Sequence, residues 1–334
     1  MPKKEADLPV ITVIEAVRDA IREEMQRDSK VFVMGEDVGQ RGGVFLATDG
    51  FLEEFGEQRV IDTPLAEGAI AGIAVGAAIQ GMRPIAEIEF ADFIWSTINH
   101  IVGEAARVRY GTNGKLSVPM VLRAPQGGGI RGGLYHSQSV EAFFSHTPGL
   151  KVVTPATPYD AKGLLKSAIR DDDPVIFLEH KRTYRLVRGE VPEEEYTVPL
   201  GRAEVKLEGD DLTIITYGLM VHHCIEAARG LADEGISVEV VDLRTIRPMD
   251  SETVLASVKK TGKALIVHED NKAGGVGGEV AAIIGQEAFE YLDGPVTRLA
   301  GPDVPAMPFS PAMEAEYMLD SEKIAAAVRR LAAY

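Results

Sequence analysis

Glu67 is the carboxylate whose surroundings in the sequence best suit acid–base chemistry. It ends the segment DTPLAE at 62–67, which joins an expected strand to an almost wholly apolar helix. Burial disfavours the charged form of a carboxyl group, whereas the positive end of a helix dipole favours it. Such opposing effects can prepare an acid for proton transfer near neutral pH. The alternative is that Glu67 simply stabilises the first turn of its helix.

The seven histidines show no spacing typical of metal ligands. His222 and His223 are adjacent, so on a helix they point in different directions, and the chain contains no HExxH pair. We therefore expect no zinc site. His268 ends an expected strand, and we interpret it as a structural histidine whose hydrogen bonds are satisfied.

Two glycine-rich segments invite comparison with nucleotide-binding loops. Residues 127–133 (GGGIRGG) lack the Lys-Ser/Thr ending of a P-loop, and residues 274–278 (GGVGG) match GxGxxG poorly. Three alternatives remain for such segments: flexible connections of an α/β fold, phosphate cradles, and a mobile loop beside an active site. The third suits the first segment, because it leads directly to Tyr135-His136-Ser137.

The elements that must position these residues follow an alternating pattern. Short apolar or β-branched runs alternate with helical periodicity, which predicts a parallel sheet covered by helices. The first helix should begin at Thr12, where TVIE resembles a capping box, and end near Arg27. We expect strands in the first half at 31–34, 59–61, 84–90, 119–122, 151–154 and 175–178.

Two expected helices of this half have unusual compositions. Residues 67–82 (EGAIAGIAVGAAIQGM) are mostly Gly, Ala and Ile. Because each glycine costs about 0.5–1 kcal/mol relative to alanine in a helix, several together indicate close backbone packing. We predict that this helix lies at a domain or subunit interface. Residues 92–110 predict a core helix with a mixed outer face.

The pattern breaks after Lys181, where two prolines and the acidic run 193–195 are typical of an exposed linker. We therefore divide the chain into an α/β domain of residues 1–185, a linker of residues 186–204 and a smaller parallel α/β domain of residues 205–334. In the second domain we expect strands at 212–217, 238–243, 264–268 and 296–299. Its expected helices lie at 220–234, 250–261, 279–292 and 321–331.

Composition limits the functions that the chain can have. The formal net charge of −16 argues against a nucleic-acid partner and is compatible with a basic protein partner or simply with solubility. The start MPKKEADLPV lacks the apolar stretch of a signal peptide, and no run is long enough to span a membrane. A single cysteine, Cys224, excludes an internal disulfide. We expect a cytoplasmic protein.

Seven motifs are distributed along the whole chain: MGEDVG at 34–39, DTPLAE at 62–67, AGIAVGAA at 71–78, EIEFADF at 87–93, LYHSQSVEAFFSHTPGLKVV at 134–153, KSAIRDDDP at 166–174 and VDLRTIRP at 241–248. Together they resemble one family, the beta subunits of the decarboxylating component of 2-oxo acid dehydrogenase complexes, of the pyruvate or branched-chain type. The resemblance implies a thiamine-pyrimidine-binding domain followed by a transketolase-like C-terminal domain.

The resemblance implies roles for five residues. Glu67 matches the glutamate that binds the aminopyrimidine nitrogen of thiamine diphosphate and promotes its deprotonation. Phe93 matches an aromatic residue packed on that ring, and Leu65 an apolar residue that lines the same pocket. Glu36 matches an acidic residue that links the proton networks of two active sites. His136 matches a histidine that assists acyl transfer to the lipoyl group.

The resemblance also implies how the metal ions are distributed. Related enzymes hold the diphosphate through magnesium with a GDG motif and a downstream Asn, whereas here Gly209-Asp210-Asp211 is the nearest approach. Magnesium should therefore be held by a separate alpha subunit, in an assembly of two alpha and two beta chains. A structural potassium ion in the beta subunit would map onto Met120, Ala168, Ile169, Asp171 and Asp173. Relatives often have Asn at position 173, so the Asp here leaves open whether the ion is bound.

The implied partners are an alpha subunit, the dihydrolipoyl acyltransferase core and a 2-oxo acid substrate. The stretch around Tyr135-His136-Ser137 favours a branched-chain substrate over pyruvate. Two other functions remain open from the sequence: the beta subunit of an acetoin dehydrogenase, and a noncatalytic relative that retains the fold.

Overall fold

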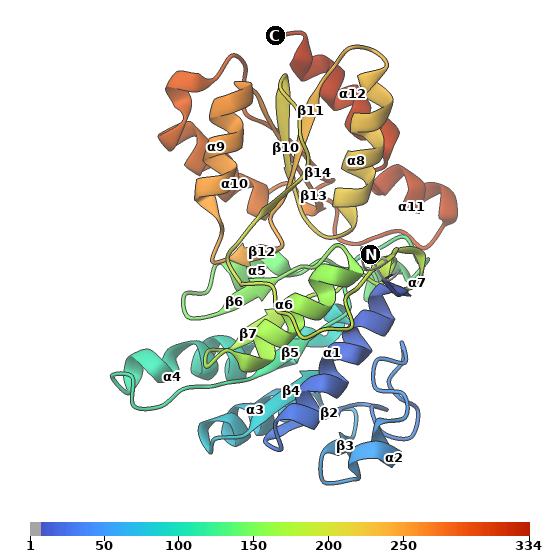
Figure 1. The fold of residues 1–334 in the computed structure, drawn as a ribbon, viewed down its shortest axis with the longest axis vertical. Helices are drawn as coiled ribbons and strands as arrows, with labels where there is room; N and C mark the ends of the chain where they lie inside the picture. The colour runs from blue at the N-terminus through green and yellow to red at the C-terminus, as the bar shows by residue number, and fades with distance from the viewer. Residues whose placement is uncertain (1–7) are drawn as a thin grey trace, which may run out of the picture.

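A computed structural model describes residues 8–334 and shows two α/β domains, one above the other in Figure 1. The α/β class predicted from the alternating pattern is confirmed. The first seven residues of the N-terminal segment lie outside the described part. Within residues 8–334, no helix is long and apolar enough to cross a membrane.

The sheet of the first domain is mostly parallel. Six strands come from the first half of the chain: β2 (Val31–Gly35), β3 (Val60–Asp62), β4 (Arg83–Glu87), β5 (Val121–Arg123), β6 (Lys151–Val153) and β7 (Val175–Phe177). A seventh, β12 (Thr245–Arg247), comes from the second half and pairs antiparallel with β6. The order is β12-β6-β7-β5-β4-β2-β3. The first sheet is thus completed by the second half of the chain.

Helices cover both faces of this sheet (Figure 1). The capping box predicted for the first helix is confirmed, because Glu15 N donates to Thr12 Oγ1 and the Glu15 carboxylate accepts from Thr12 N. The helices of this domain are α1 (Val13–Arg27), α2 (Phe51–Phe55), α3 (Glu67–Ile79), α4 (Ala106–Gly111), α5 (Glu141–Ser145), α6 (Pro158–Arg170) and α7 (Thr183–Leu186).

The second domain repeats this layering with five strands in the order β14-β13-β10-β11-β9. Only β9 is antiparallel to its neighbour. The strands are β9 (Glu204–Leu207), β10 (Leu212–Thr216), β11 (Val238–Asp242), β13 (Ala264–Asn271) and β14 (Thr297–Gly301). Its helices are α8 (Leu219–Ala232), α9 (Ser251–Thr261), α10 (Val276–Glu287), η4 (Phe289–Tyr291), α11 (Pro311–Tyr317) and α12 (Ser321–Ala332).

Two sequence predictions need correction. Residues 92–110 do not form one α-helix: a 3₁₀ helix η1 (Ala91–Thr97) leads into a π-helix η2 (Asn99–Ala105) and then α4. The segment 186–204 is not simply exposed. Its strand β8 (Arg188–Glu190) pairs with β1 (Val10–Thr12), and Val191 and Val198 are buried. Val198 packs into a core cluster of the first domain. Buried apolar residues therefore hold this segment against the domain although its prolines and acidic residues are typical of an exposed linker.

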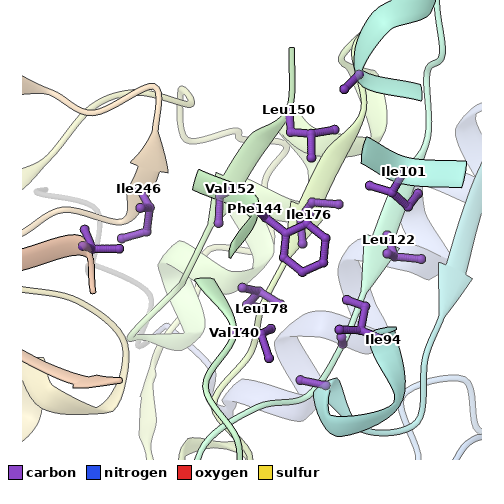
Figure 2. Packing of buried hydrophobic residues seen from close by; sticks show 14 of the residues in the cluster. Ile94, Ile101, Leu122, Val140, Phe144, Leu150, Val152, Ile176, Leu178 and Ile246 are labelled. Atoms are coloured by element: carbon purple, nitrogen blue, oxygen red, sulfur yellow. The ribbon is translucent and has the colours of Figure 1, made fainter. Parts of the chain in front are cut away.

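The hydrophobic core continues from one domain into the other. One cluster of buried side chains includes Phe144 and Ile176 of the first domain together with Ile246 of β12. Figure 2 shows Phe144 packed among strands of the first sheet, with Ile246 beside Val152. Because apolar contact crosses the boundary, the two domains pack as one body on this side.

A buried ion-pair triad ties the centre of the first sheet together. Arg123 on β5 is 1% exposed and pairs with Glu87 on β4 and with Glu179 just after β7. The Arg123 Nε to Glu179 Oε1 distance is 2.7 Å. Burial opposes the charge of the guanidinium, but the two carboxylates raise the pKa of Arg123 above its ordinary value. The arginine therefore stays charged.

Replacing Arg123 by Met should leave two buried carboxylates without a cation and lower the free energy of unfolding by about 3–5 kcal/mol. Denaturant unfolding of the full chain measures this. The surface variant Arg329→Met, which breaks the exposed pair with Glu234, is the control and should have a much smaller effect. Equal losses in the two variants would contradict a central role for Arg123.

Candidate active site

The candidate site lies at the carboxyl edge of the first sheet. Glu36 directly follows β2, Leu65 and Glu67 follow β3, and Phe90 follows β4. These strands are neighbours, since Gly35 of β2 lies opposite Asp62 of β3 and Glu87 of β4. Parallel strands bring the loops after them to one edge, which is where α/β proteins bind ligands.

Glu36 is the unusual carboxylate of this edge. It is 6% exposed, and neither carboxylate oxygen makes a hydrogen bond of normal geometry among the described residues, although the backbone of Ala66 lies close enough to lower its pKa against the larger effect of burial. Burial, followed by the nearby charge of Glu67, raises the pKa of Glu36 from 4.5 to about 7. A buried acceptor without a partner is costly, so it indicates a polar group that binds here.

Glu67 is the first residue of α3, at the positive end of the helix dipole. The glycines of α3 allow close packing, because a Cβ on Gly68 would lie only 3.1 Å from the carbonyl oxygen of Ser96 in η1. Leu65, just before the helix, is 79% exposed, and Ile73 on α3 is 57% exposed. The rim beside Glu67 is therefore open and apolar, and the interface role of this helix stays a prediction.

Phe93 and His136 are brought together by segments far apart in the chain. Their ring centroids lie 5.4 Å apart in edge-to-face contact. Phe90 touches both, at 4.5 Å from His136 and 6.0 Å from Phe93. The histidine is half-buried and its ring orientation is fixed by the two aromatic rings.

Three further residues of the site were not singled out from the sequence. Phe90 orients His136. Asp92 is buried, and its Oδ1 accepts hydrogen bonds from the backbone N–H groups of Ser137 and Gln138 at 3.1 and 3.2 Å. Lys181 lies with Nζ 5.6 Å from the Phe90 ring centroid, and burial lowers its pKa to about 8. Phe90 and Asp92 lie within the motif EIEFADF, which was the available signal.

The glycine-rich loop 127–133 does not offer a phosphate cradle. The backbone N–H groups of Gly128, Gly129 and Arg131 already donate to carboxylates of Glu269 and Glu314. A phosphate would have to displace two anions. Of the three alternatives, a loop beside the candidate site fits best, although the loop is held by hydrogen bonds along its length.

The second glycine-rich segment lies against His268. That histidine is fully buried within β13, which continues to Asn271 and does not end at His268 as expected from the sequence. A Cβ on Gly275 or Gly277 would lie 2.7 Å from its ring. The expectation that His268 is hydrogen-bonded is not confirmed, because neither ring nitrogen makes a hydrogen bond of normal geometry among the described residues, although the backbone of Asp270 lies close enough to raise its pKa. Burial lowers its pKa to about 4, so the ring is neutral.

The expected potassium ligands come together, but their surroundings are already cationic. Arg83 Nη1 donates to the carbonyl oxygens of Ile169 and Asp171 at 3.1 and 2.9 Å. Lys151 Nζ lies 2.7 and 2.6 Å from the carboxylate oxygens of Asp171. The carbonyls of Met120 and Ala168 accept backbone N–H groups, and Asp173 pairs with Arg109. These oxygens do not fit a potassium ion, because the side chains of Arg83 and Lys151 already bind the oxygens of Ile169 and Asp171.

The nearest approach to a diphosphate motif lies in a different part of the fold. Gly209, Asp210 and Asp211 form the turn before β10, and the last two donate backbone N–H groups to Ser237. This turn lies at the amino end of β10, whereas Tyr217, just past its carboxyl end, contacts Glu141 of the first domain. Within residues 8–334, no cluster of three acidic, histidine or cysteine side chains is placed to hold a metal ion.

The geometry therefore forms one side of a binding site. A buried carboxyl of raised pKa, a carboxylate at a helix start and an aromatic pair share one edge, and the apolar rim beside them is exposed. Such a surface can hydrogen-bond a polar nitrogen of a flat heterocycle and pack against its face. These residues fit the pyrimidine end of thiamine diphosphate, but they include no group that would hold its diphosphate.

Comparison with known proteins agrees with this fold. Residues 10–187 match the family description "Transketolase, pyrimidine binding domain", and residues 201–324 match "Transketolase, C-terminal domain". A solved structure titled "Split gene transketolase, inactive beta4 tetramer" superposes with a TM-score of 0.79 at 26% identity. The superposition covers 97% of this chain and 98% of that one.

Bacterial proteins of one type are similar over nearly the whole chain. The 2-oxoisovalerate dehydrogenase subunit beta of Bacillus subtilis is 58% identical over 98% of this chain and 100% of its own length. The pyruvate dehydrogenase E1 component subunit beta of B. subtilis is 52% identical over 90% of this chain and 93% of its own. The corresponding Staphylococcus aureus protein is 47% identical over 88% and 90%. The chain therefore belongs to the family of transketolase-type beta subunits of 2-oxo acid dehydrogenases.

Proposed function

We propose that this chain is the beta subunit of a branched-chain 2-oxo acid dehydrogenase and supplies half of a thiamine-diphosphate site. With an alpha subunit, it decarboxylates a 2-oxo acid and passes the acyl group to a lipoyl group. One observation supports this most: the buried Glu36 carboxyl has no hydrogen bond of normal geometry within residues 8–334 and lies near Glu67 at an open edge of the site. An alpha subunit would close that edge.

Each site residue has a task that its position supports. Glu67 would bind the aminopyrimidine nitrogen and hold the proton there, while Phe93 and Leu65 would enclose the ring. Glu36 would carry protons toward Glu67, since its pKa near 7 allows it to gain and lose them at neutral pH. Thiamine diphosphate, when bound, supplies the carbon nucleophile and the electron sink for decarboxylation. His136 would position or protonate the acyl acceptor.

The alpha subunit would hold magnesium and the diphosphate. Support comes from the lack of a GDG motif at this site and from the exposed Leu65, which is 79% accessible without a partner. We propose an assembly of two alpha and two beta chains. The acidic chain, with a net charge of −16, would suit a basic docking domain of the dihydrolipoyl acyltransferase core.

The proposed substrates are branched-chain 2-oxo acids. Identity to the B. subtilis 2-oxoisovalerate enzyme exceeds identity to the pyruvate enzyme, at 58% against 52%, and extends over more of the chain. An acetoin dehydrogenase beta subunit would also need an alpha subunit. An assay of acetoin cleavage distinguishes this function from 2-oxo acid decarboxylation. A noncatalytic relative is disfavoured by Glu67, Phe93 and His136, which lie together at one edge.

Reconstitution with an alpha subunit tests the function directly. The wild-type pair should decarboxylate 2-oxoisovalerate faster than pyruvate, whereas the beta chain alone should show no turnover. Glu67→Gln should reduce the decarboxylation rate by about 100-fold or more, because an amide cannot exchange the proton. Size-exclusion chromatography should show unchanged assembly. Full activity in this variant would exclude the proposed role of Glu67, and acetoin cleavage by the wild-type pair would favour the other enzyme class.

The pH dependence of stability tests the buried Glu36. Its raised pKa means that between about pH 4.5 and 7 the folded chain holds a proton that the unfolded chain has released. Stability from this group is therefore present at low pH and is lost as pH rises through that window. Gln does not titrate, so Glu36→Gln removes this loss. The free energy of unfolding of the variant minus that of the wild type should therefore be roughly 1–3 kcal/mol larger at pH 8 than at pH 5.

Urea unfolding of the full chain at both pH values measures this difference. Glu53→Gln, on the exposed side of α2, is the matched control and should show the same difference from wild type at both values. A Glu36→Gln effect that is independent of pH would contradict the assignment.

Potassium should not stabilise the chain. Arg83 and Lys151 already bind the oxygens of Ile169 and Asp171, so unfolding midpoints in potassium, sodium and choline chloride at equal ionic strength should agree within about 1 °C. Arg83→Met should lower the midpoint in all three salts. A midpoint that rises by several degrees in potassium alone would show that the ion does bind.

A further inference from the structure

The loop that carries His136 is held by carboxylates from three separate elements. It runs from Gly127 after β5 to Gln138 before α5. Asp92 of η1 belongs to the first domain, whereas Glu269 of β13 and Glu314 of α11 belong to the second. Figure 1 shows α11 at the boundary between the domains, near α7.

Glu314 binds the middle of the loop. Its Oε1 accepts hydrogen bonds from the backbone N–H of Gly129 at 3.1 Å and of Arg131 at 3.0 Å, across 185 and 183 residues of sequence. The side chain is 7% exposed although its neighbours on α11 are exposed. Hydrogen bonds to an ionised acceptor are stronger than neutral ones, so one side chain fixes two loop residues.

Glu269 binds the start of the loop. Its Oε1 accepts from Gly128 N at 2.6 Å, and its Oε2 lies 2.8 Å from His180 Nε2. Burial opposes its charge, but His180 and the loop amide keep the pKa of Glu269 below its ordinary value. This carboxylate is therefore ionised and bridges β13 of the second domain to the loop and to His180 of the first.

The loop conformation depends on these contacts. Arg131 has φ 61°, in the left-handed region that residues other than glycine rarely adopt. Gly127 has φ 87°, and a Cβ there would lie 2.1 Å from the His180 ring. Gly128 lies against Met307 of the second domain. Such a backbone persists when its surroundings overdetermine it, and here the second domain provides part of those surroundings.

We propose that the C-terminal domain positions His136 through a carboxylate clamp on this loop, with Glu314 and Glu269 as positioning residues. Asp92 holds the end of the loop nearest to His136, and Phe90 and Phe93 orient the ring. The clamp gives the second domain a task in the reaction through the backbone of a loop that belongs to the first domain. This inference rests on the proposed function for the role of His136 but not for the clamp itself.

Hydrogen exchange on the full chain tests the clamp without any cofactor or partner. Glu314→Ala should speed amide exchange in residues 128–138 by about tenfold or more, the loss expected when hydrogen bonds to an ionised carboxylate are removed. Glu314→Gln keeps an acceptor oxygen and should restore most of the protection. Glu316→Ala, an exposed position on the same helix, is the control and should leave exchange unchanged. Unchanged loop exchange in Glu314→Ala would overturn the proposal.

Two partial reactions of the reconstituted complex test the link to His136. Decarboxylation with an artificial electron acceptor does not need acyl transfer, whereas acylation of a lipoyl domain does. Glu314→Ala should slow lipoyl acylation by about tenfold relative to decarboxylation, and Glu314→Gln should recover it. An equal loss in both reactions would reduce the clamp to a structural support and overturn the positioning role. A wild-type complex that does not decarboxylate any 2-oxo acid would instead refute the proposed function and leave the exchange result standing.

Discussion

Burial of the Arg123 charge between two carboxylates organises the first domain around the candidate site. Glu87, Arg123 and Glu179 stand at the carboxyl ends of β4, β5 and the strand β7 beside them. Each is followed within a few residues by a segment of the site: Phe90 to Phe93 after Glu87, the loop with His136 after Arg123, and His180 and Lys181 after Glu179. Because a buried charge tolerates little displacement without loss of its partners, the three strand ends are held in fixed relation.

The second domain is joined to this arrangement by both apolar and charged contacts. Ile246 lies on β12, which extends the first sheet, and its side chain belongs to the same core cluster as Phe144. On the other side of the boundary, Glu269 and Glu314 bind backbone amides of the glycine-rich loop. Apolar contact fixes the position of the domains, while the directional hydrogen bonds fix the shape of the loop.

The site is open where a partner would complete it. Leu65, two residues before Glu67, and Ile73, further along α3, are exposed, and the oxygens of the buried Glu36 make no hydrogen bond of normal geometry in the part of the chain that the structure describes. A folded chain normally satisfies its buried acceptors, so this imbalance is better explained by a polar ligand than by folding stability. The oxygens at the expected potassium position are already paired, because Arg83 and Lys151 of the same chain bind the carbonyl and the carboxylate of Asp171.

The sequence by itself determined the α/β class, the capping box at Thr12 and most strand positions, because periodicity and caps are local properties. It also predicts a role for Glu67. It further indicated Phe93 and His136 by resemblance, and their contact is visible only in the fold.

Tertiary structure decided which residues distant in sequence contact one another. Residues 92–110, expected as one α-helix, form 3₁₀, π and α turns, and the segment 186–204 is partly buried. Neither ring nitrogen of His268 makes a hydrogen bond of normal geometry within residues 8–334. Glu314 reaches a loop 183 residues away, and Arg83 reaches the carbonyl of Asp171 across 88. Such contacts form between residues that only the fold brings together, so a local sequence pattern does not predict them.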